Sequence, residues 1–378
     1  METGEKINRG LKALEEKVLD RNLCTACGAC LSLCPYLRSW KGRVVKLDDC
    51  NLEEGRCFAY CPRTEVDLDE IYQTVFGKNY EEIDVGPARK IMMARAKNPI
   101  WRKKAQTGGV VSSLVDFALR EKIIRAGILT PRDGDLLPYG QIIRGRKGIL
   151  SAAGSSYVSG PTLEALNRGA WKGQERIGIV GLPCQVLALA RMKTSKLEKK
   201  TPIDQVNLVI GLFCTWALDY KPFMAFLQDR VDGRSIKKLN ITPPPERIFE
   251  VLAGNKLYRI SVDGIRPFIR PSCRVCLDMT AELSDLSIGT VEGKEGWNTV
   301  IVRTAMGENL LKRAKRAGVI ETRPLSKNNL NHLKEASLLK KRRVLDALNE
   351  KGGIEKAYFT LSPQLIKRIL SESGESLT

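Results

Sequence analysis

The sequence predicts an α/β (α+β) fold in which a small cysteine-rich module precedes a mixed-sheet core with flanking helices. Three observations lead to this prediction. Seven of the eleven cysteines lie between Cys24 and Cys61. After Pro87, short β-branched runs alternate with stretches of helical apolar spacing, as in buried strands and the helices that cover them. From Pro324 onward the chain becomes polar and then helical. We therefore expect three segments, at residues 1–86, 87–325 and 326–378.

The first four cysteines form the run C-x2-C-x2-C-x3-C, followed by proline. They are Cys24, Cys27, Cys30 and Cys34, before Pro35. In such a run, three thiolates bind one cubane 4Fe-4S cluster and the fourth binds a second cluster. Zinc sites favour separated C-x2-C pairs, and the charged N-terminus shows no secretory signal that would favour disulfides. The spacing therefore predicts a bacterial-ferredoxin-like module.

The second half of this module departs from the ferredoxin pattern. Cysteines are expected three and six residues before Cys57, where the chain has Glu54 and Asn51, and Cys50 is one position out of register. On the usual crossed arrangement, the first cluster is bound by Cys24, Cys27, Cys30 and Cys61, and the second by Cys34, Cys50 and Cys57. The remaining iron position of the second cluster is open, filled by Glu54, or completed by another non-cysteine group.

Four further cysteines lie in the second segment. Cys184 follows the run IGIVGLP, and Cys214 follows the run VNLVIGLF. Each thiol is thus expected at the carboxyl end of a buried strand, the edge at which open α/β sheets build sites. Cys273 and Cys276 form a C-x2-C pair in a proline-flanked loop. We expect the four to form one site with a third cluster. The alternative is that Cys184 and Cys214 are buried structural cysteines.

The periodicity of the second and third segments predicts individual elements. We expect helices at 110–119 and 329–350, and strands at 123–129, 177–180 and 206–213. No apolar run approaches the ~20 residues that a membrane-spanning helix requires.

The chain is strongly basic, with 62 Lys and Arg residues against 43 Asp and Glu, a net charge of +19. No nucleic-acid-binding motif accompanies this charge, which favours a phosphorylated cofactor or an acidic partner. The run Lys340, Lys341, Arg342 and Arg343 is expected to be a solvated helix face, with docking on an acidic membrane complex as the alternative. The sole histidine, His332, is expected on the surface, which excludes histidine-based hydrolysis.

Several motifs occur in one order along the chain: QTGGVVSSL at 106–114, GLPCQ at 181–185, GLFC at 211–214, CRVC at 273–276 and LSDLSIG at 283–289. They resemble the family of coenzyme F420-reducing hydrogenase and dehydrogenase beta subunits over roughly residues 88–350. With its ferredoxin module, the chain resembles the input subunit of F420H2 dehydrogenase. The resemblance implies a mixed-sheet flavoprotein core that binds FAD and a core 4Fe-4S cluster, with coenzyme F420 as hydride donor or acceptor.

The resemblance also implies that glycine-containing turns contact the FAD. Thr107, Gly108 and Gly109 precede a predicted helix, whose N-terminus is suited to bind an anion, and Lys103 stands just upstream. An ordinary glycine turn is the alternative. Gly154, Ser155 and Gly181 are candidates on the same basis, although Ser156 stands where the family pattern leads us to expect lysine.

The expected function is oxidation of reduced coenzyme F420, with hydride transfer to FAD and passage of single electrons through about three 4Fe-4S clusters to partner subunits. One alternative is an electron-transfer adaptor of a heterodisulfide-reductase-like, hydrogenase or formate dehydrogenase complex without free F420. Another is a ferredoxin-dependent flavin reductase of the chlorophyllide type. We expect a cytoplasmic location, free or peripheral on the inner face of the membrane. The direction of flow and the natural electron partner stay open.

Overall fold

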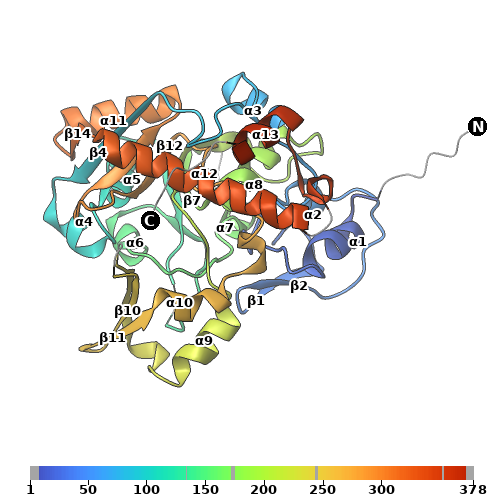
Figure 1. Cartoon of the computed structure of the whole chain (residues 1–378), viewed down its shortest axis with the longest axis horizontal. Coiled ribbons are helices and arrows are strands. Elements are labelled where there is room, and N and C mark those ends of the chain that lie inside the picture. The colour runs from blue at the N-terminus through green and yellow to red at the C-terminus, as the bar shows by residue number, and fades with distance from the viewer. Residues whose placement is uncertain (1–7, 133, 172–174, 243–245, 351–352, 372–378) are drawn as a thin grey trace, which may run out of the picture.

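The centre of the molecule is an eight-stranded mixed sheet. The computed structural model describes residues 8–132, 134–171, 175–242, 246–350 and 353–371. The sheet has the strand order β14-β4-β13-β12-β8-β7-β5-β6. Strands β14, β4, β12 and β7 of this sheet are labelled in Figure 1. Its strands are β4 (Lys90–Ala96), β5 (Ala126–Leu129), β6 (Gln141–Ile143), β7 (Ile177–Gly181), β8 (Val206–Leu212), β12 (Leu286–Thr290), β13 (Asn298–Val302) and β14 (Ile320–Pro324). Neighbours among β12, β8, β7 and β5 pair in parallel, and the other pairs are antiparallel.

Helices cover both faces of this sheet, which explains the continuous apolar runs of its inner strands. Along β7, Ile177 and Ile179 belong to one buried cluster and Val180 to another, as expected for side chains that alternate between faces. One face is covered by α5 (Val110–Arg120) and α11 (Ala305–Arg316). The other is covered by α3 (Leu68–Phe76), α8 (Pro183–Thr194), α12 (Lys327–Glu350) and α13 (Pro363–Ser371). The predicted α/β class is confirmed.

The cysteine-rich N-terminal module lies at one end of the molecule, blue in Figure 1. It contains α1 (Leu11–Leu14), a π-helical turn (Glu15–Leu19), the antiparallel hairpin of β1 (Leu37–Trp40) and β2 (Arg43–Lys46), and α2 (Arg56–Ala59). Its β3 (Val66–Asp67) pairs in parallel with β15 (Phe359–Thr360) from the other end of the chain. Buried Arg270 donates to the carbonyl oxygens of Cys24 and Gly42 and thereby fixes the module to the core. The segment boundaries at 86 and 325 stay a prediction.

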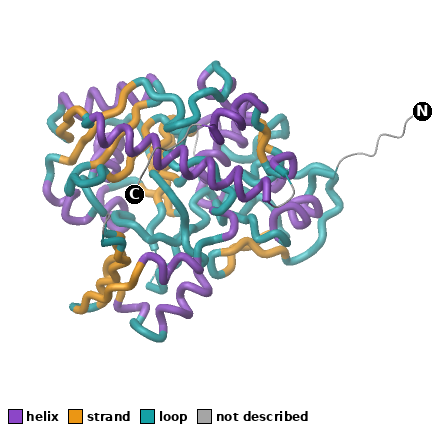
Figure 2. The backbone as a smooth tube through the Cα atoms, in the orientation of Figure 1, coloured by secondary structure: helices purple, strands orange, loops and turns teal. Residues whose placement is uncertain are grey.

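A smaller three-stranded antiparallel sheet, seen as a separate orange group in Figure 2, has the order β11-β10-β9. Its strands are β9 (Ile236–Ile241), β10 (Ile248–Ala253) and β11 (Lys256–Ser261), packed with α9 (Tyr220–Gln228) and α10 (Val262–Ile265). The other helices are α4 (Pro99–Lys104), α6 (Arg146–Ser151) and α7 (Glu164–Arg168), and there are 3-10 turns at Ile203–Gln205, Gly233–Ser235, Arg266–Phe268, Pro271–Cys273 and Ile354–Lys356. Phe223 of α9 contacts Phe249 of β10 edge-to-face at 5.7 Å.

The predicted elements occur with small shifts in their ends. The helices at 110–119 and 329–350 are α5 and α12, and the strands at 177–180 and 206–213 are β7 and β8. The strand predicted from residue 123 begins only at Ala126, because a turn follows α5 and Lys122 has a φ of 54° there. Within the described residues, no helix combines the length and apolarity needed to cross a membrane.

The prediction that the basic run of α12 is a solvated face is wrong for two of its residues. Lys340 is 5% exposed and Lys341 is 0% exposed. The Lys341 ammonium donates to the buried Glu282 carboxylate and, at 2.9 Å, to the Tyr80 hydroxyl. Burial alone would lower the pKa of Lys341, but Glu282 raises it above its usual value. The lysine heads are therefore buried because each finds partners inside the fold. His332 is partly exposed, with its Nδ1 2.6 Å from a Glu292 carboxylate oxygen.

Candidate functional site

The first cysteine group comprises Cys24, Cys27, Cys30 and Cys61. Burial, followed by the neighbouring Cys61 and Cys24, raises the pKa of Cys27 to about 12. The pKa of Cys30 is raised by burial and then by Cys27, Cys24 and Cys61, so all four thiols lie within electrostatic reach of one another. Gly28 allows this loop to approach the core, because a Cβ there would lie 2.7 Å from the Glu164 nitrogen. The fold thus gathers the four residues of the predicted crossed arrangement.

The second cysteine group comprises Cys34, Cys50 and Cys57. Burial, with contributions from Cys34 and Cys50, raises the pKa of Cys57 to about 11. The neighbouring Glu54 side chain is exposed, and the Glu54 backbone forms an isolated bridge with Arg9. The role of Glu54 as a further ligand therefore stays a prediction.

The core cysteine group comprises Cys184, Cys214, Cys273 and Cys276. Cys184 lies in the first turn of α8, directly after β7, and Cys214 follows β8, so both lie at the carboxyl edge of the sheet as predicted. The pair Cys273 and Cys276 reaches the same place from the loop after the small sheet. Burial raises the pKa of Cys214, and the three other cysteines of the group each raise it further.

Two cations face the core group. The Lys340 ammonium donates to the carbonyl oxygens of Cys214 and Asp278, each at 2.8 Å. Although burial raises the pKa of Cys276, Lys340 and Arg63 together lower it below its usual value. The two cations thus favour the thiolate of Cys276, the form that binds metal.

The residues around the core group fit an iron–sulfur cluster. All four side chains are sulfur donors, which favour such clusters over ions that prefer oxygen. The buried Ser272 hydroxyl and Arg63 Nε have no hydrogen-bond partner within the described part of the chain, and both lie beside this group. Such groups can donate hydrogen bonds to the sulfur atoms of a cluster. Among the described residues, no group of three or more His, Cys, Asp or Glu side chains is arranged for a single metal ion.

The candidate FAD segment lies at the same edge of the sheet. Gly109 caps α5 with a φ of 73°, and Asn298, the first residue of β13, donates to the Thr107 hydroxyl at 2.6 Å. A Cβ at Gly108 would lie 2.7 Å from the Asn298 side-chain oxygen, so this position requires glycine. Asn298 thus holds the turn in place, and no sequence motif around Asn298 predicts this role.

The loop that contains the candidates Gly154 and Ser155 lies close to the candidate segment at 107–109. The Gln106 amide lies 3.4 Å from the Tyr157 hydroxyl and also donates to Asn240. Gly154 has a φ of 105° and lies near the carbonyl oxygen of Lys104. The Gln106 Oε1 atom is buried with no partner in the described chain, and this free acceptor fits a polar cofactor. Ser155 lies on this loop, Lys103 is exposed in α4, and Gly181 ends β7 at the same sheet edge.

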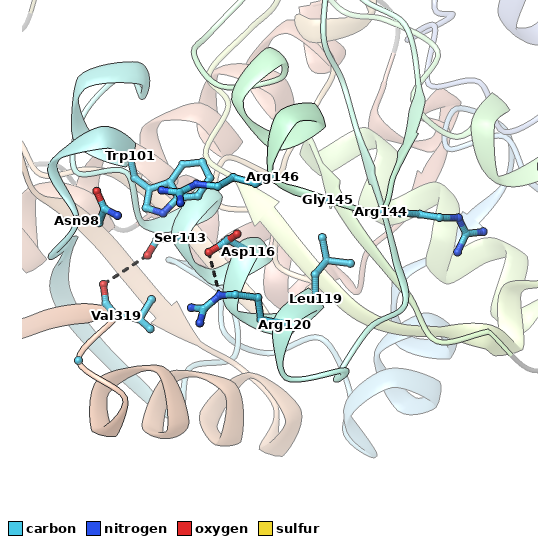
Figure 3. Close-up of a pocket in the computed structure, with 11 residues that line it drawn as sticks. Asn98, Trp101, Ser113, Asp116, Leu119, Arg120, Arg144, Gly145, Arg146 and Val319 are labelled. Carbon is cyan, nitrogen blue, oxygen red and sulfur yellow. Dashed lines mark hydrogen bonds and ion pairs between the residues drawn. The ribbon is translucent and has the colours of Figure 1, made fainter.

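A separate cleft of about 600 Å³ lies beside α5 (Figure 3). The Arg146 guanidinium stacks on the Trp101 ring at 5.0 Å, and Arg120 pairs with Asp116 at 3.2 Å. The Ser113 hydroxyl donates to the Val319 carbonyl oxygen at 3.4 Å. The lining residues include Ser113 of the motif at 106–114 but none of the predicted cofactor contacts.

Comparison with known proteins places this arrangement in a family. The model for the N-terminal part of the coenzyme F420 hydrogenase/dehydrogenase beta subunit matches residues 91–167, and the model for its C terminus matches residues 174–328. The chain belongs to this family of beta subunits. The family match covers the core sheet and the core cysteine group, and it ends before most of the predicted C-terminal segment.

Relatives within the family act in F420-linked systems. Coenzyme F420 hydrogenase subunit beta of Methanothermobacter thermautotrophicus is 28% identical over 69% of this chain and 94% of the relative. A subunit of the F(420)H(2) dehydrogenase of Methanosarcina mazei is 25% identical over 77% of this chain and 82% of the relative. A chain of the F420-reducing NiFe hydrogenase complex from Methanosarcina barkeri has a TM-score of 0.67 at 26% identity, covering 75% of this chain and 99% of that one. The family resemblance is therefore confirmed, and an oxidoreductase subunit is supported.

Proposed function

We propose that the chain is an electron-input subunit that oxidises reduced coenzyme F420 and delivers single electrons to a partner complex. The observation that carries the proposal is the succession of the three cysteine groups. The pKa of Cys184 in the core group is raised by burial and also by Cys27 of the first group. The pKa of Cys30 in the first group is in turn raised by Cys57 of the second group, among larger causes. The groups thus form a series from the sheet edge to the outer module.

The proposed resident cofactors are FAD and about three 4Fe-4S clusters, one per cysteine group. Bound FAD would supply the exchange between two-electron hydride chemistry and one-electron transfer. The turn at Thr107, Gly108 and Gly109 would bind its phosphates through the first amides of α5, with Lys103 adding positive charge. Gly154, Ser155 and Gly181 line the same edge and are proposed contacts. The eleven cysteines are the proposed iron ligands.

The choice of substrate rests on the relatives and on charge. Two relatives are named as subunits of enzymes that act on coenzyme F420 or its reduced form. The net charge of +19 would raise the encounter rate with a phosphorylated, acidic coenzyme. We propose that electrons leave through the second cysteine group, because that group lies in the outer module.

The test is anaerobic purification, measurement of iron and FAD, and mixing with reduced F420, NADH and reduced ferredoxin in turn. Bleaching of the flavin absorbance by reduced F420 alone supports the proposal. Rapid reduction by ferredoxin with no response to reduced F420 would instead identify an adaptor subunit or a ferredoxin-dependent reductase.

A further inference from the structure

Arg63 is a buried cation between two of the cysteine groups. It stands two residues after Cys61 of the first group and is 2% exposed. One guanidinium nitrogen donates to the carbonyl oxygen of Ser272, the residue before Cys273. A small cavity of about 40 Å³ is lined by Arg63 together with Cys184 and Cys276 of the core group. The guanidinium therefore lies where the first group and the core group approach each other.

The hydrogen-bond acceptors of Arg63 in the described structure are neutral, so the charge of its guanidinium is directed at the nearby core cysteines. A second nitrogen donates to the carbonyl oxygen of Pro62 at 2.9 Å, and the guanidinium carbon lies 4.5 Å from the centre of the Tyr358 ring. The Pro62 and Ser272 acceptors are neutral backbone oxygens, and Nε has no partner among the described residues. An arginine guanidinium keeps its proton at any physiological pH. The residue is a fixed positive charge.

We propose that Arg63 is a positioning residue that raises the reduction potential of the core cluster and so sets the order in which the core and first clusters are reduced. A nearby buried cation stabilises the more negative, reduced form of a cluster. Arg63 should raise the reduction potential of the core cluster more than that of the first cluster. The reason is that Arg63 lines a cavity with two of the core cysteines and also donates to the backbone beside a third. One electron enters the cluster, no bond forms or breaks at Arg63, and no proton is transferred. The inference rests on the proposed function, since it requires a cluster in the core group.

The test is a redox titration of the full chain, reconstituted under anaerobic conditions and followed by EPR. A Cys276→Ser protein identifies which signal belongs to the core cluster. In Arg63→Met, the core cluster should be at least about tenfold less reduced at a fixed potential, equivalent to about 59 mV for one electron. Arg63→Lys keeps a positive charge and should restore most of the shift. Lys334→Met removes an exposed charge on α12 and should leave the potential unchanged.

The outcomes separate a tuning role from a structural one. Arg63→Gln keeps a side-chain amide for Ser272 but removes the charge, so it should shift the potential like Arg63→Met. An unshifted potential in Arg63→Gln with full iron content overturns the proposal, even if Arg63→Met loses iron. Absence of the core signal from the unsubstituted protein is a different failure, because it removes the proposed function itself.

Discussion

Removal of the Lys341 ammonium should be among the most destabilising single changes in α12. The Lys341 and Glu282 side chains are 0% and 3% exposed, and Glu282 also accepts from the Tyr72 hydroxyl. In Lys341→Met the Glu282 carboxylate stays buried without its cation. Breaking a buried pair in this way costs about 3–5 kcal/mol. The expected result is a loss of this size in the free energy of unfolding.

Lys334→Met provides the matched control on the same helix. Lys334 pairs with Asp84 at 2.7 Å, but its side chain is 43% exposed, so its loss should cost at most about 1 kcal/mol. Anaerobic urea unfolding, followed by far-UV circular dichroism on samples of equal iron content, compares the two variants. The double variant Lys341→Met with Glu282→Gln should regain part of the stability, because the Glu282 carboxylate that lost its ammonium partner is no longer charged. Equal losses in Lys341→Met and Lys334→Met would show that the buried pair contributes no more than a surface ion pair.

Four further predictions follow from the site and its charges. Cys276→Ser should lower the iron content by about four atoms per chain while FAD content is kept, and unchanged iron would exclude this cysteine as a ligand. Asn298→Ala should release the turn at Thr107 and weaken FAD retention on gel filtration, whereas full retention would argue against that turn as the binding segment. The rate of flavin reduction by reduced F420 should fall steeply between about 0.1 M and 1 M salt, as the Debye length shrinks from about 10 Å to about 3 Å, and a flat profile would show that charge does not guide binding. Lys17 and Arg9 hold the pKa of Glu65 below its usual value. The contribution of Glu65 to stability is therefore present above its unfolded pKa of about 4.3 and is lost as the pH falls. Glu65→Gln should be less stable than the parent protein at pH 7, and the free energies of unfolding of the two proteins should converge in acid.

The cysteine groups and the inner strands could be predicted from sequence because both signals are local. The spacing of Cys24, Cys27 and Cys30 places three thiols on one loop, whatever the rest of the chain does. The runs that form β7 and β8 are continuously apolar, since helices cover both sheet faces. The cysteines that follow these strands then had to lie at one edge of the sheet.

The features that sequence reasoning missed depend on distant partners. Lys341 is buried because Glu282, 59 residues away, accepts a hydrogen bond from its ammonium. Arg63 reaches the backbone of Ser272, 209 residues away, and Asn298 holds Thr107 across 191 residues. A charge run, a lone arginine or a single asparagine gives no local sign of such contacts, so burial could not be inferred from their sequence neighbours.

The proposed oxidation of reduced F420 can be followed directly by stopped-flow absorbance of the anaerobic protein. We predict rapid loss of the flavin band, followed by bleaching of the broader iron–sulfur absorbance as single electrons spread through the three cysteine groups. NADH under the same conditions should cause neither change. A flavin band that stays oxidised with reduced F420, in protein with full FAD and iron content, would contradict the proposed function.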